Sequence, residues 1–459
     1  MEVTYLGHAC YLIKINELNI LVDPILTNSF QGGTAAVSPA CSINVDSLPY
    51  IDAVIITHCH PGHLEVDSLA LLPNETVVFY PADPTIELVL EGLGFNNRNI
   101  LEAGQEVEFA GGKFIVTGTT TNVPEIGIVF QEADATCWYL ADTNVTPEII
   151  GSVLDDVKTI DFLICNFPGY HHQFFTGSHL SFPINDLSTT LEQVLRVKPK
   201  LVAPNFSGLR YLGDASWINR IMFPMSPELF LEEVRKLNTN QQVANLLPGD
   251  VVIVSVGSCK IHSRRSEIIN LLEEVQLNSF DPMKEIPLLK DPNPENLESK
   301  ELEFHTQNFL LNELVPWIKN NCDKQGSLLA TYKQLGIKFR LTVIYPNELE
   351  ENWIITLNNQ EINCVKLENL KEYSFHFGLR IAASVLDRWH KAEIPYYHVY
   401  CYARPYGQIY KTGVASDNSV YAEQVPTRDL VSLYLSGNTE TVYHPWLRKQ
   451  IAKYRGVIA

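Results

Sequence analysis

The sequence predicts an α/β protein in which a layered N-terminal domain is followed by a smaller α+β domain. Up to about residue 258, short apolar runs typical of strands alternate with segments of helical period, and this alternation is typical of a layered α/β core. Residues 281–303 are rich in proline and charge, as linkers are. We therefore expect a domain at 1–258, a connecting segment at 259–303 and a C-terminal α+β domain at 304–459.

The first strands are expected to form a hairpin. VTYLGHACYLIKI (3–15) and LNILVDPIL (18–26) flank a short polar turn, and Asp23-Pro24 ends the second strand. DAVIIT (52–57) is an apolar strand that leads directly into THCHPGHLE (57–65). This histidine-rich stretch therefore lies on a loop at the C-terminal end of a strand, which is where open sheets place their chemistry.

The remaining elements of the N-terminal domain repeat the same pattern. A helix is expected over 65–72 and another at TIELVLEGLGF (85–95), where a glycine ends the apolar period. Strands are expected at TVVFYPA (76–82), KFIVTG (113–118), IGIVFQE (126–132), CWYLADTN (137–144), DFLICNF (161–167), LVAPNF (201–206) and DVVIVSV (250–256).

The C-terminal domain begins with an expected helix at NFLLNELVPWIKNN (308–321). FRLTVIYP (339–346), NWIITLNN (352–359) and EINCVKL (361–367) follow as a predicted three-strand meander. SFHFGLRIAASVLDRWH (374–390) has helical period and is predicted to form one long helix.

Composition narrows the possible functions and the compartment. The chain has 34 basic and 53 acidic residues, and this net charge of -19 repels nucleic acid and anionic membranes. We expect no nucleic-acid partner and no membrane span, since no run of 18 apolar residues occurs. The nine cysteines form no CxxC pair and no secretory signal is visible, which predicts reduced thiols and a cytoplasmic location.

The stretch THCHPGHLE presents an H-x-H-x-x-H array that can direct three imidazoles, those of His58, His60 and His63, to one point. Imidazole at this density suits zinc or iron rather than magnesium or calcium. The alternative is three exposed loop histidines. Asp142, at the end of a predicted strand, is the expected anionic ligand and a catalytic residue, although an N-cap aspartate of the following helix is equally common there.

A second histidine-rich stretch, NFPGYHHQFFTGSH (166–179), offers further candidate ligands in His171, His172 and His179. One of them can complete a coordination shell, while adjacent histidines usually point to opposite sides. The alternative is that the stretch lines a substrate pocket or forms a surface aromatic loop.

Other polar residues at strand ends are expected to support the site. His8 is a second catalytic candidate, and Asp23 and Glu65 are expected to orient the ligating imidazoles from behind. The alternative for His8 and Asp23 is a simple turn contact with backbone. Tyr170, Arg210 and Tyr211 are candidates for a pocket that holds a small-molecule substrate, with loop packing as the alternative.

Four segments, YLGHACYLI, LVDPIL, THCHPGHLE and YLADT, resemble in order and spacing the metallo-β-lactamase fold superfamily. Within it the chain is most similar to the CMP-N-acetylneuraminate (CMP-sialic acid) hydroxylase group, and DFLICNFPGY, KPKLVAPNFSGLRYLG and LLPGDVVIV extend this resemblance. The resemblance implies a metallo-β-lactamase-type αββα sandwich. It implies that His58 and His60 bind a first metal ion, that His63 binds a second and that Asp142 bridges the two. It also implies that Asp23 lies behind the histidine loop and that His8 is the histidine of the GHA turn.

The chain departs from the pattern of that superfamily at three ligand positions. Gly62 stands where hydrolases of this fold have a metal-ligating aspartate, so restoring aspartate at 62 is expected to strengthen binding of a second metal. GTTTNVPE (118–125) lacks the usual third histidine and offers Glu125 among its polar residues, and VAPNFSG (202–208) lacks the last histidine. These changes remove ligands that a hydrolytic centre with two zinc ions needs.

Three functions are compatible with these residues. The first is a non-haem iron oxygenase or hydroxylase, with one or two iron ions, that acts on a small polar metabolite. The Rieske cluster of the hydroxylase group has no counterpart beyond a lone Cys259-x-x-His262, so a separate electron-donor protein is expected. The second is a zinc-dependent hydrolase of an amide, ester or phosphodiester, and the third is a degenerate, non-catalytic binding domain.

Overall fold

The computed structural model describes every residue except 110, 122, 171–181, 206–207, 264–265, 273–279, 282, 369–373, 408, 415–419, 426–427, 438–442 and 456–459. The described residues form two compact units. The first lies within Met1–His171, Phe182–Pro282 and Gln450–Ala459, and the second within Met283–Lys449. No helix in the described part of the chain is long and apolar enough to cross a membrane.

The first unit contains two large sheets. One has the strand order β18 (Ser258–His262), β17 (Val251–Ser255), β1 (Glu2–Gly7), β2 (Cys10–Ile15), β3 (Leu18–Val22), β6 (Ala53–Ile55), β7 (Val77–Pro81) and β8 (Arg98–Leu101). The other has the order β16 (Gln242–Val243), β14 (Leu201–Pro204), β13 (Phe162–Cys165), β12 (Ala135–Tyr139), β11 (Gly127–Glu132), β10 (Gly112–Thr117) and β9 (Glu106–Phe109).

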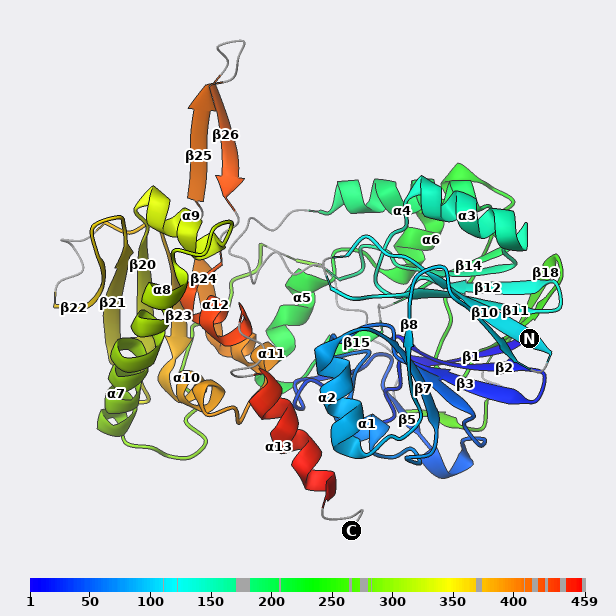
Figure 1. The fold of residues 1–459 in the computed structure, drawn as a ribbon, viewed down its shortest axis with the longest axis horizontal. Helices are drawn as coiled ribbons and strands as arrows, with labels where there is room; N and C mark the ends of the chain where they lie inside the picture. Colours follow the sequence, from blue (N-terminus) through cyan, green and yellow to red (C-terminus); the bar gives the residue numbers. More distant parts are fainter. Residues whose placement is uncertain are drawn as a thin grey trace. The chain divides into compact units, whose positions relative to one another are not determined.

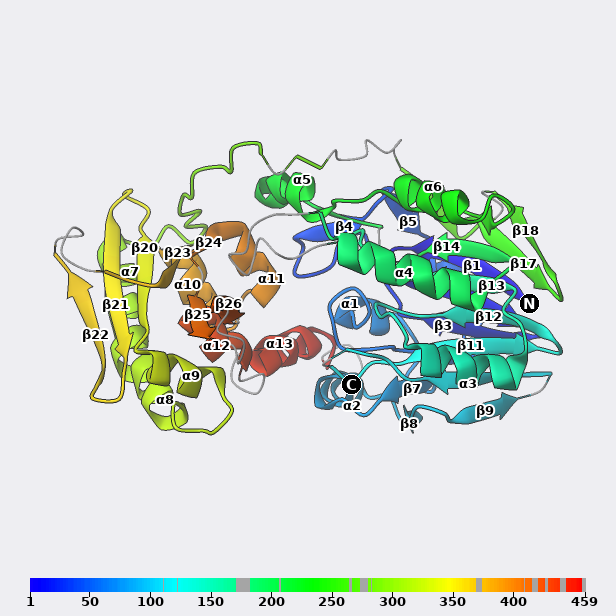
Figure 2. The same cartoon turned by 90° about the horizontal axis from the view of Figure 1, so that it is seen from above.

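Alternating side chains of these strands build two apolar layers. In β12, Cys137 and Tyr139 belong to the core that both sheets share, whereas Trp138 belongs to the layer under the helices, because successive side chains of a strand point to opposite faces. Helices α3 (Pro147–Val157), α4 (Ile184–Val197) and α6 (Pro227–Leu237) cover that second sheet, and α1 (Val66–Leu69) and α2 (Pro84–Leu93) lie on the other side of the sandwich (Figures 1 and 2). The predicted αββα sandwich is confirmed.

Shorter elements complete the first unit. Two small antiparallel pairs join distant segments, β4 (Ala35–Val37) with β15 (Leu209–Tyr211) and β5 (Cys41–Ile43) with β19 (Ile269–Leu271). The others are the 3-10 turns η1 (Val45–Ser47) and η3 (Gly213–Ile218) and the helix α5 (Asn219–Met222).

The second unit is an α+β structure around a five-stranded sheet. Its strand order is β22 (Ile362–Leu367), β21 (Glu350–Leu357), β20 (Lys338–Ile344), β23 (Phe377–Ala382) and β24 (Ala403–Tyr406), so the predicted meander is confirmed. The other elements are α7 (Ser299–Asn308), the π-helical turn η4 (Phe309–Leu314), α8 (Val315–Asn321), α9 (Leu328–Leu335), α10 (Ala383–His390), α11 (Tyr396–Val399), η6 (Tyr400–Tyr402), β25 (Ile409–Val414), β26 (Val420–Val425) and α12 (Leu430–Gly437). Helix α13 (Tyr443–Arg455) has residues in both units.

The connecting segment predicted at 259–303 has ordered partners in its described parts. Strand β18 pairs with β17, β19 pairs with β5, and Asp291 Oδ2 accepts a hydrogen bond of 2.9 Å from Ser384 N at the start of α10. The boundaries 1–258 and 304–459 as those of separate functional domains stay a prediction.

The single long helix predicted at 374–390 is wrong in its first half. FGLRIA forms β23, which pairs in parallel with β20 and antiparallel with β24, and only the residues from Ala383 onward are helical. The segment is buried on both faces, and a short apolar run of this kind suits a buried helix and a central strand equally well. Gly378 also brings its backbone so close to β20 that an added Cβ would lie 2.5 Å from Arg340 O.

Replacing Gly378 with alanine is expected to lower the free energy of unfolding of the second unit by about 1–3 kcal/mol, because the new methyl group overpacks the sheet. Urea unfolding followed by tryptophan fluorescence measures this change. Gly151→Ala is the matched control, since nothing lies within 4 Å of an added Cβ there, and in helix α3 it should raise stability by about 0.5–1 kcal/mol. Equal effects of the two substitutions would contradict the overpacking argument.

Candidate metal centre

The histidine loop follows β6, as the sequence predicts. His60 O accepts hydrogen bonds of 3.0 Å from both His63 N and Leu64 N, which closes the loop into a tight turn. His58 and His63 are fully buried, while His60 is exposed. Helix α1 begins directly after the loop, and Glu65 caps it by accepting a 2.7 Å hydrogen bond from Ser68 N.

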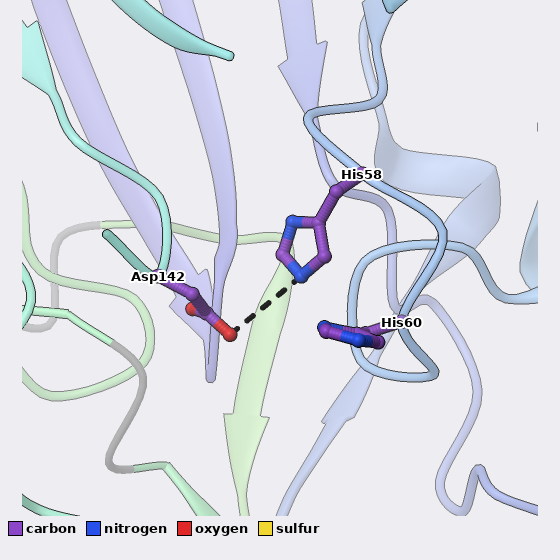
Figure 3. A group of neighbouring side chains, drawn as sticks. All are labelled: His58, His60 and Asp142. Carbon is purple, nitrogen blue, oxygen red and sulfur yellow. Dashed lines mark ion pairs between the residues drawn. The ribbon is translucent and has the colours of Figure 1, made fainter. Parts of the chain in front are cut away.

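Asp142 approaches this loop from the end of β12 in the other sheet. Its Oδ1 lies 3.2 Å from His63 Nε2 and its Oδ2 lies 3.7 Å from His58 Nε2. One ligand atom each of His58, His60 and Asp142 lie within 4.8 Å of one another, and Figure 3 shows the three side chains directed to a common point. The structure thus brings together four residues that the sequence predicts as ligands.

The donor set fits a metal ion. His58 Nε2 is buried and has no hydrogen-bond partner among the described residues. Buried polar atoms normally have such a partner, and a bound ion is one way to supply it. Two imidazoles and one carboxylate, with other positions left open, suit iron or zinc.

Asp23 supports the loop from behind, as expected. Its two carboxylate oxygens accept hydrogen bonds of 2.8 Å from Thr57 N, Thr57 Oγ1 and Tyr139 Oη. Its Oδ2 also lies 2.7 Å from His63 Nδ1, so the Nε2 atom of His63 is turned to Asp142. A carboxylate in this position fixes the orientation and tautomer of a ligating imidazole.

Glu125 is a supporting residue that the sequence indicated only as a substitute for a missing histidine. Its Oε1 accepts a 2.9 Å hydrogen bond from Asp142 N and lies 3.9 Å from His58 Nδ1. The carboxylate is thus on the Nδ1 side of His58, whereas Asp142 is on its Nε2 side. Only the resemblance, which places a missing histidine near GTTTNVPE, pointed to this residue.

Burial and charge set the protonation of these groups. Burial, followed by the neighbouring His63 and His60, lowers the pKa of His58 well below its usual value, so His58 is neutral, the form that ligates metals. Burial also lowers the pKa of His63, but Asp142 and Asp23 outweigh this effect and raise it to about 10. The pKa of Glu125 rises to about 7 through burial and the charge of Asp142.

His8 lies beside the loop, with its ring next to Gly62. A Cβ atom added to Gly62 would lie 2.7 Å from His8 Nε2, and Gly62 has a φ of +129° that side chains rarely adopt. The expectation that aspartate at 62 strengthens metal binding stays a prediction, and such an aspartate would have to displace the His8 ring and adopt a strained backbone angle. The His8 ring is fully buried and stacks on Phe30 with a centroid distance of 5.4 Å.

Three residues of the site have left-handed backbone that is uncommon for side chains other than glycine. The φ angles are 53° at His8, 45° at Asp23 and 54° at Ala141, directly before Asp142. Such conformations persist only where the surrounding structure holds them, and they occur preferentially at functional sites. All three residues stand in turns that follow a strand of the sandwich.

The remaining predicted residues are only partly placed. His171, His172 and His179 lie outside the described residues. Tyr170 Oη and Tyr211 Oη lie 3.0 Å apart, and burial, with a smaller contribution from the charge of Asp142, raises the pKa of Tyr170 to about 12. Arg210 lies between Leu209 and Tyr211 on β15, opposite Ala36.

Comparison with known proteins covers the part of the chain that contains this arrangement. Residues 18–204 match the family described as "Beta-lactamase superfamily domain". The chain is 30% identical over 115 residues to a cytidine monophosphate-N-acetylneuraminic acid hydroxylase of Asterias rubens, a match that covers 24% of this chain and 18% of that protein. It is 23% identical over 269 residues to a metal-dependent hydrolase of Methanopyrus kandleri, covering 54% of this chain and 98% of the hydrolase.

Among solved structures, the diiron β-hydroxylase CmlA of Streptomyces venezuelae superposes with a TM-score of 0.40 at 17% identity, over 55% of this chain and 53% of CmlA. The matches span 18% to 43% of the length of the first three curated relatives. The family match begins at β3 and ends at β14, and so contains both the histidine loop and Asp142. The part of the first unit that holds His58, His60 and Asp142 is therefore similar to the beta-lactamase superfamily domain.

Proposed function

We propose that the chain is an iron-dependent oxygenase that hydroxylates a small polar metabolite. The observation that carries this proposal is the group of His58, His60 and Asp142, whose ligand atoms lie within 4.8 Å of one another. Two histidines and one carboxylate with open positions are the ligand set of many non-haem iron oxygenases. The similarity to a sialic acid hydroxylase over 115 residues supports the same reaction class.

The residues of this chain hold and orient the reacting groups. Asp142 is fixed by two backbone contacts, since its N–H donates to Glu125 Oε1 at 2.9 Å and its carbonyl accepts from Asn166 Nδ2 at 2.7 Å. His63, held by Asp23, aligns the Asp142 carboxylate from the other side. Iron, when bound, supplies the one-electron and oxygen chemistry that no amino-acid side chain provides.

Tyr170, Arg210 and Tyr211 are proposed to bind the substrate. The guanidinium of Arg210 suits a carboxylate or phosphate, because its planar donors match two oxygens at once. The paired hydroxyls of Tyr170 and Tyr211 add polar contacts in an otherwise buried aromatic setting. A separate electron-donor protein is proposed to deliver the electrons that an oxygenase reaction consumes.

The second candidate function is zinc-dependent hydrolysis of an amide, ester or phosphodiester. It is favoured by the match to a metal-dependent hydrolase, which covers nearly the whole of that protein. In this case the same ligands would hold zinc, and the water bound to it would be the nucleophile. A domain that only binds, the third candidate, would require no metal at all.

The experiment offers equal amounts of Fe²⁺ and Zn²⁺ to the metal-free full chain under anaerobic conditions. Bound metal is measured by mass spectrometry, and nitric oxide is added as an EPR probe of open positions on ferrous iron. The oxygenase predicts retained iron and a nitrosyl EPR spectrum that is lost in Asp142→Asn. Retention of zinc alone supports the hydrolase, and retention of neither ion supports the non-catalytic domain.

A further inference from the structure

We propose that the last turns of α13, from Gln450 to Tyr454, are a positioning element of the metal centre, because they hold helix α1 and, through it, the end of the histidine loop. Gln450 and the described residues after it belong to the first unit, as α1 and the histidine loop do. This inference rests on the metal-dependent function proposed above and adds to it a segment from the opposite end of the chain.

Helix α1 is too short to hold its own position. It has four residues, Val66–Leu69, and a single helical turn is not stable without tertiary contacts. Only Leu64 and the capping residue Glu65 stand between His63 and this helix. The contacts that fix α1 therefore also fix the direction in which the chain leaves His63.

Hydrogen bonds from two distant parts of the chain hold α1. Ser68 is fully buried, and its Oγ accepts a hydrogen bond of 2.8 Å from Leu26 N. Asp67 Oδ1 accepts a hydrogen bond of 2.7 Å from the hydroxyl of Tyr454, which lies 387 positions further along the chain. Helix α1 is thus tied to the segment that follows β3 and to α13.

A second contact shows that the neighbouring helix α2 has a place for this segment. Ile451 is 2% exposed, and a Cβ added to Gly92 in the last turn of α2 would lie 2.8 Å from both Ile451 Cδ1 and Ile451 Cγ2. A helix is usually more stable with alanine than with glycine, but here glycine leaves the space that the Ile451 side chain occupies. Ile451 and Tyr454 are three residues apart and so lie on one face of α13, and Figures 1 and 2 both show the end of α13 beside α1 and α2.

These contacts act on the metal centre through the turn that closes the histidine loop. His60 O accepts the hydrogen bonds of His63 N and Leu64 N, and Leu64 leads into α1. When α1 loses its bond to α13, we expect this turn to open more often and to carry His60 away from His58. A hydrogen bond to a charged group corresponds to a change of about 10-fold in such an opening equilibrium.

The test compares the full wild-type chain with Tyr454→Phe, which removes only the hydroxyl group. Hydrogen exchange of the metal-free proteins is followed by mass spectrometry on fragments that contain His63 and Leu64, and Co²⁺ is titrated by its visible absorption. Tyr454→Phe should speed up exchange in these fragments by about 10-fold. It should also weaken Co²⁺ binding by about 10-fold, the lower end of the loss that follows removal of an outer contact.

Two controls separate this effect from a general loss of stability. Exchange in β17 should stay as in the wild type, because β1, β2 and β3 lie between β17 and β6 in the sheet. Tyr50→Phe changes a tyrosine of the same unit that is 69% exposed, and it should alter neither loop exchange nor Co²⁺ binding.

Gly92→Ala tests the same hold without changing Tyr454 or Asp67. The added methyl group should displace Ile451 and produce the same two changes as Tyr454→Phe. The two substitutions together should add little to either one, since both release the same segment. Gly151→Ala is the control, because nothing lies within 4 Å of an added Cβ there, and it should leave loop exchange and Co²⁺ binding unchanged.

An unchanged loop exchange or an unchanged Co²⁺ affinity in Tyr454→Phe would overturn the inference. Exchange that becomes equally faster in β17 and in the loop would overturn it as well, because α13 would then stabilise the unit as a whole. In all these cases the function proposed above still stands. A wild type that does not bind Co²⁺ would instead overturn the metal-dependent function itself, so the two failures are distinguishable.

Discussion

Replacing His60 with alanine is expected to remove most of the bound metal without harming the fold. His60 is exposed, so its side chain adds little to the core, yet its ring meets the fully buried ring of His58 at a centroid distance of 4.7 Å. Loss of one of three protein ligands lowers metal affinity far more than the 10- to 100-fold typical of an outer contact. Metal content after gel filtration measures the result, and the thermal unfolding profile checks the fold.

His262→Ala is the matched control for this substitution. His262 is a partly exposed histidine on β18 of the same unit, at the end of the sheet away from β6. Its replacement should leave the metal content as in the wild type. An unchanged metal content in His60→Ala would refute the assignment of the whole histidine loop as a metal site.

Replacing Asp23 with alanine is expected to lower the free energy of unfolding by about 3–5 kcal/mol, the usual result of removing one partner of a buried ion pair. The substitution leaves Thr57, His63 and Tyr139 without their shared acceptor, and unsatisfied buried donors are costly. It should also weaken metal binding by about 10- to 100-fold, because His63 loses its orientation.

Denaturant unfolding and metal titration of Asp23→Ala measure both effects. Asp46→Ala serves as the control, since Asp46 is exposed on η1, and surface changes of this kind usually stay within about 0.5 kcal/mol. A loss of stability no larger than that of the control would contradict the role of Asp23 as the shared acceptor. Full stability with weakened metal binding would limit its role to the orientation of His63.

The sandwich and the position of the histidine loop were predictable because strand ends are readable in the sequence. An apolar run followed by polar residues places His58 and Asp142 at the ends of β6 and β12, and the two sheets bring these ends together. The strand β23 was not predictable in the same way, since FGLRIA suits a buried helix as well as a central strand, and only its pairing with β20 decides between them.

The contacts that surround the predicted ligands could not be read from the sequence. Glu125 approaches His58 across loops of different strands, and no local pattern encodes that approach. The approach of the His8 ring to Gly62 depends on a left-handed backbone angle at each residue and on ring stacking with Phe30. From the sequence, Gly62 is a position where a ligand has been lost. The structure shows that the His8 ring occupies the space where a side chain at 62 would begin.

The origin of the ligands in two different sheets has a mechanical consequence. His58 and His60 follow a strand of one sheet and Asp142 follows a strand of the other. An ion held by all three residues would therefore join the two sheets at one edge of the sandwich. The Tyr139 hydroxyl, on one sheet, donates a hydrogen bond to Asp23, at the end of a strand of the other sheet, and so also links the two sheets at that edge. Because a ligand that binds only the folded state stabilises it by mass action, about 2.7 kcal/mol at a hundredfold excess over its dissociation constant, the availability of metal in the surroundings would govern how readily the two sheets separate.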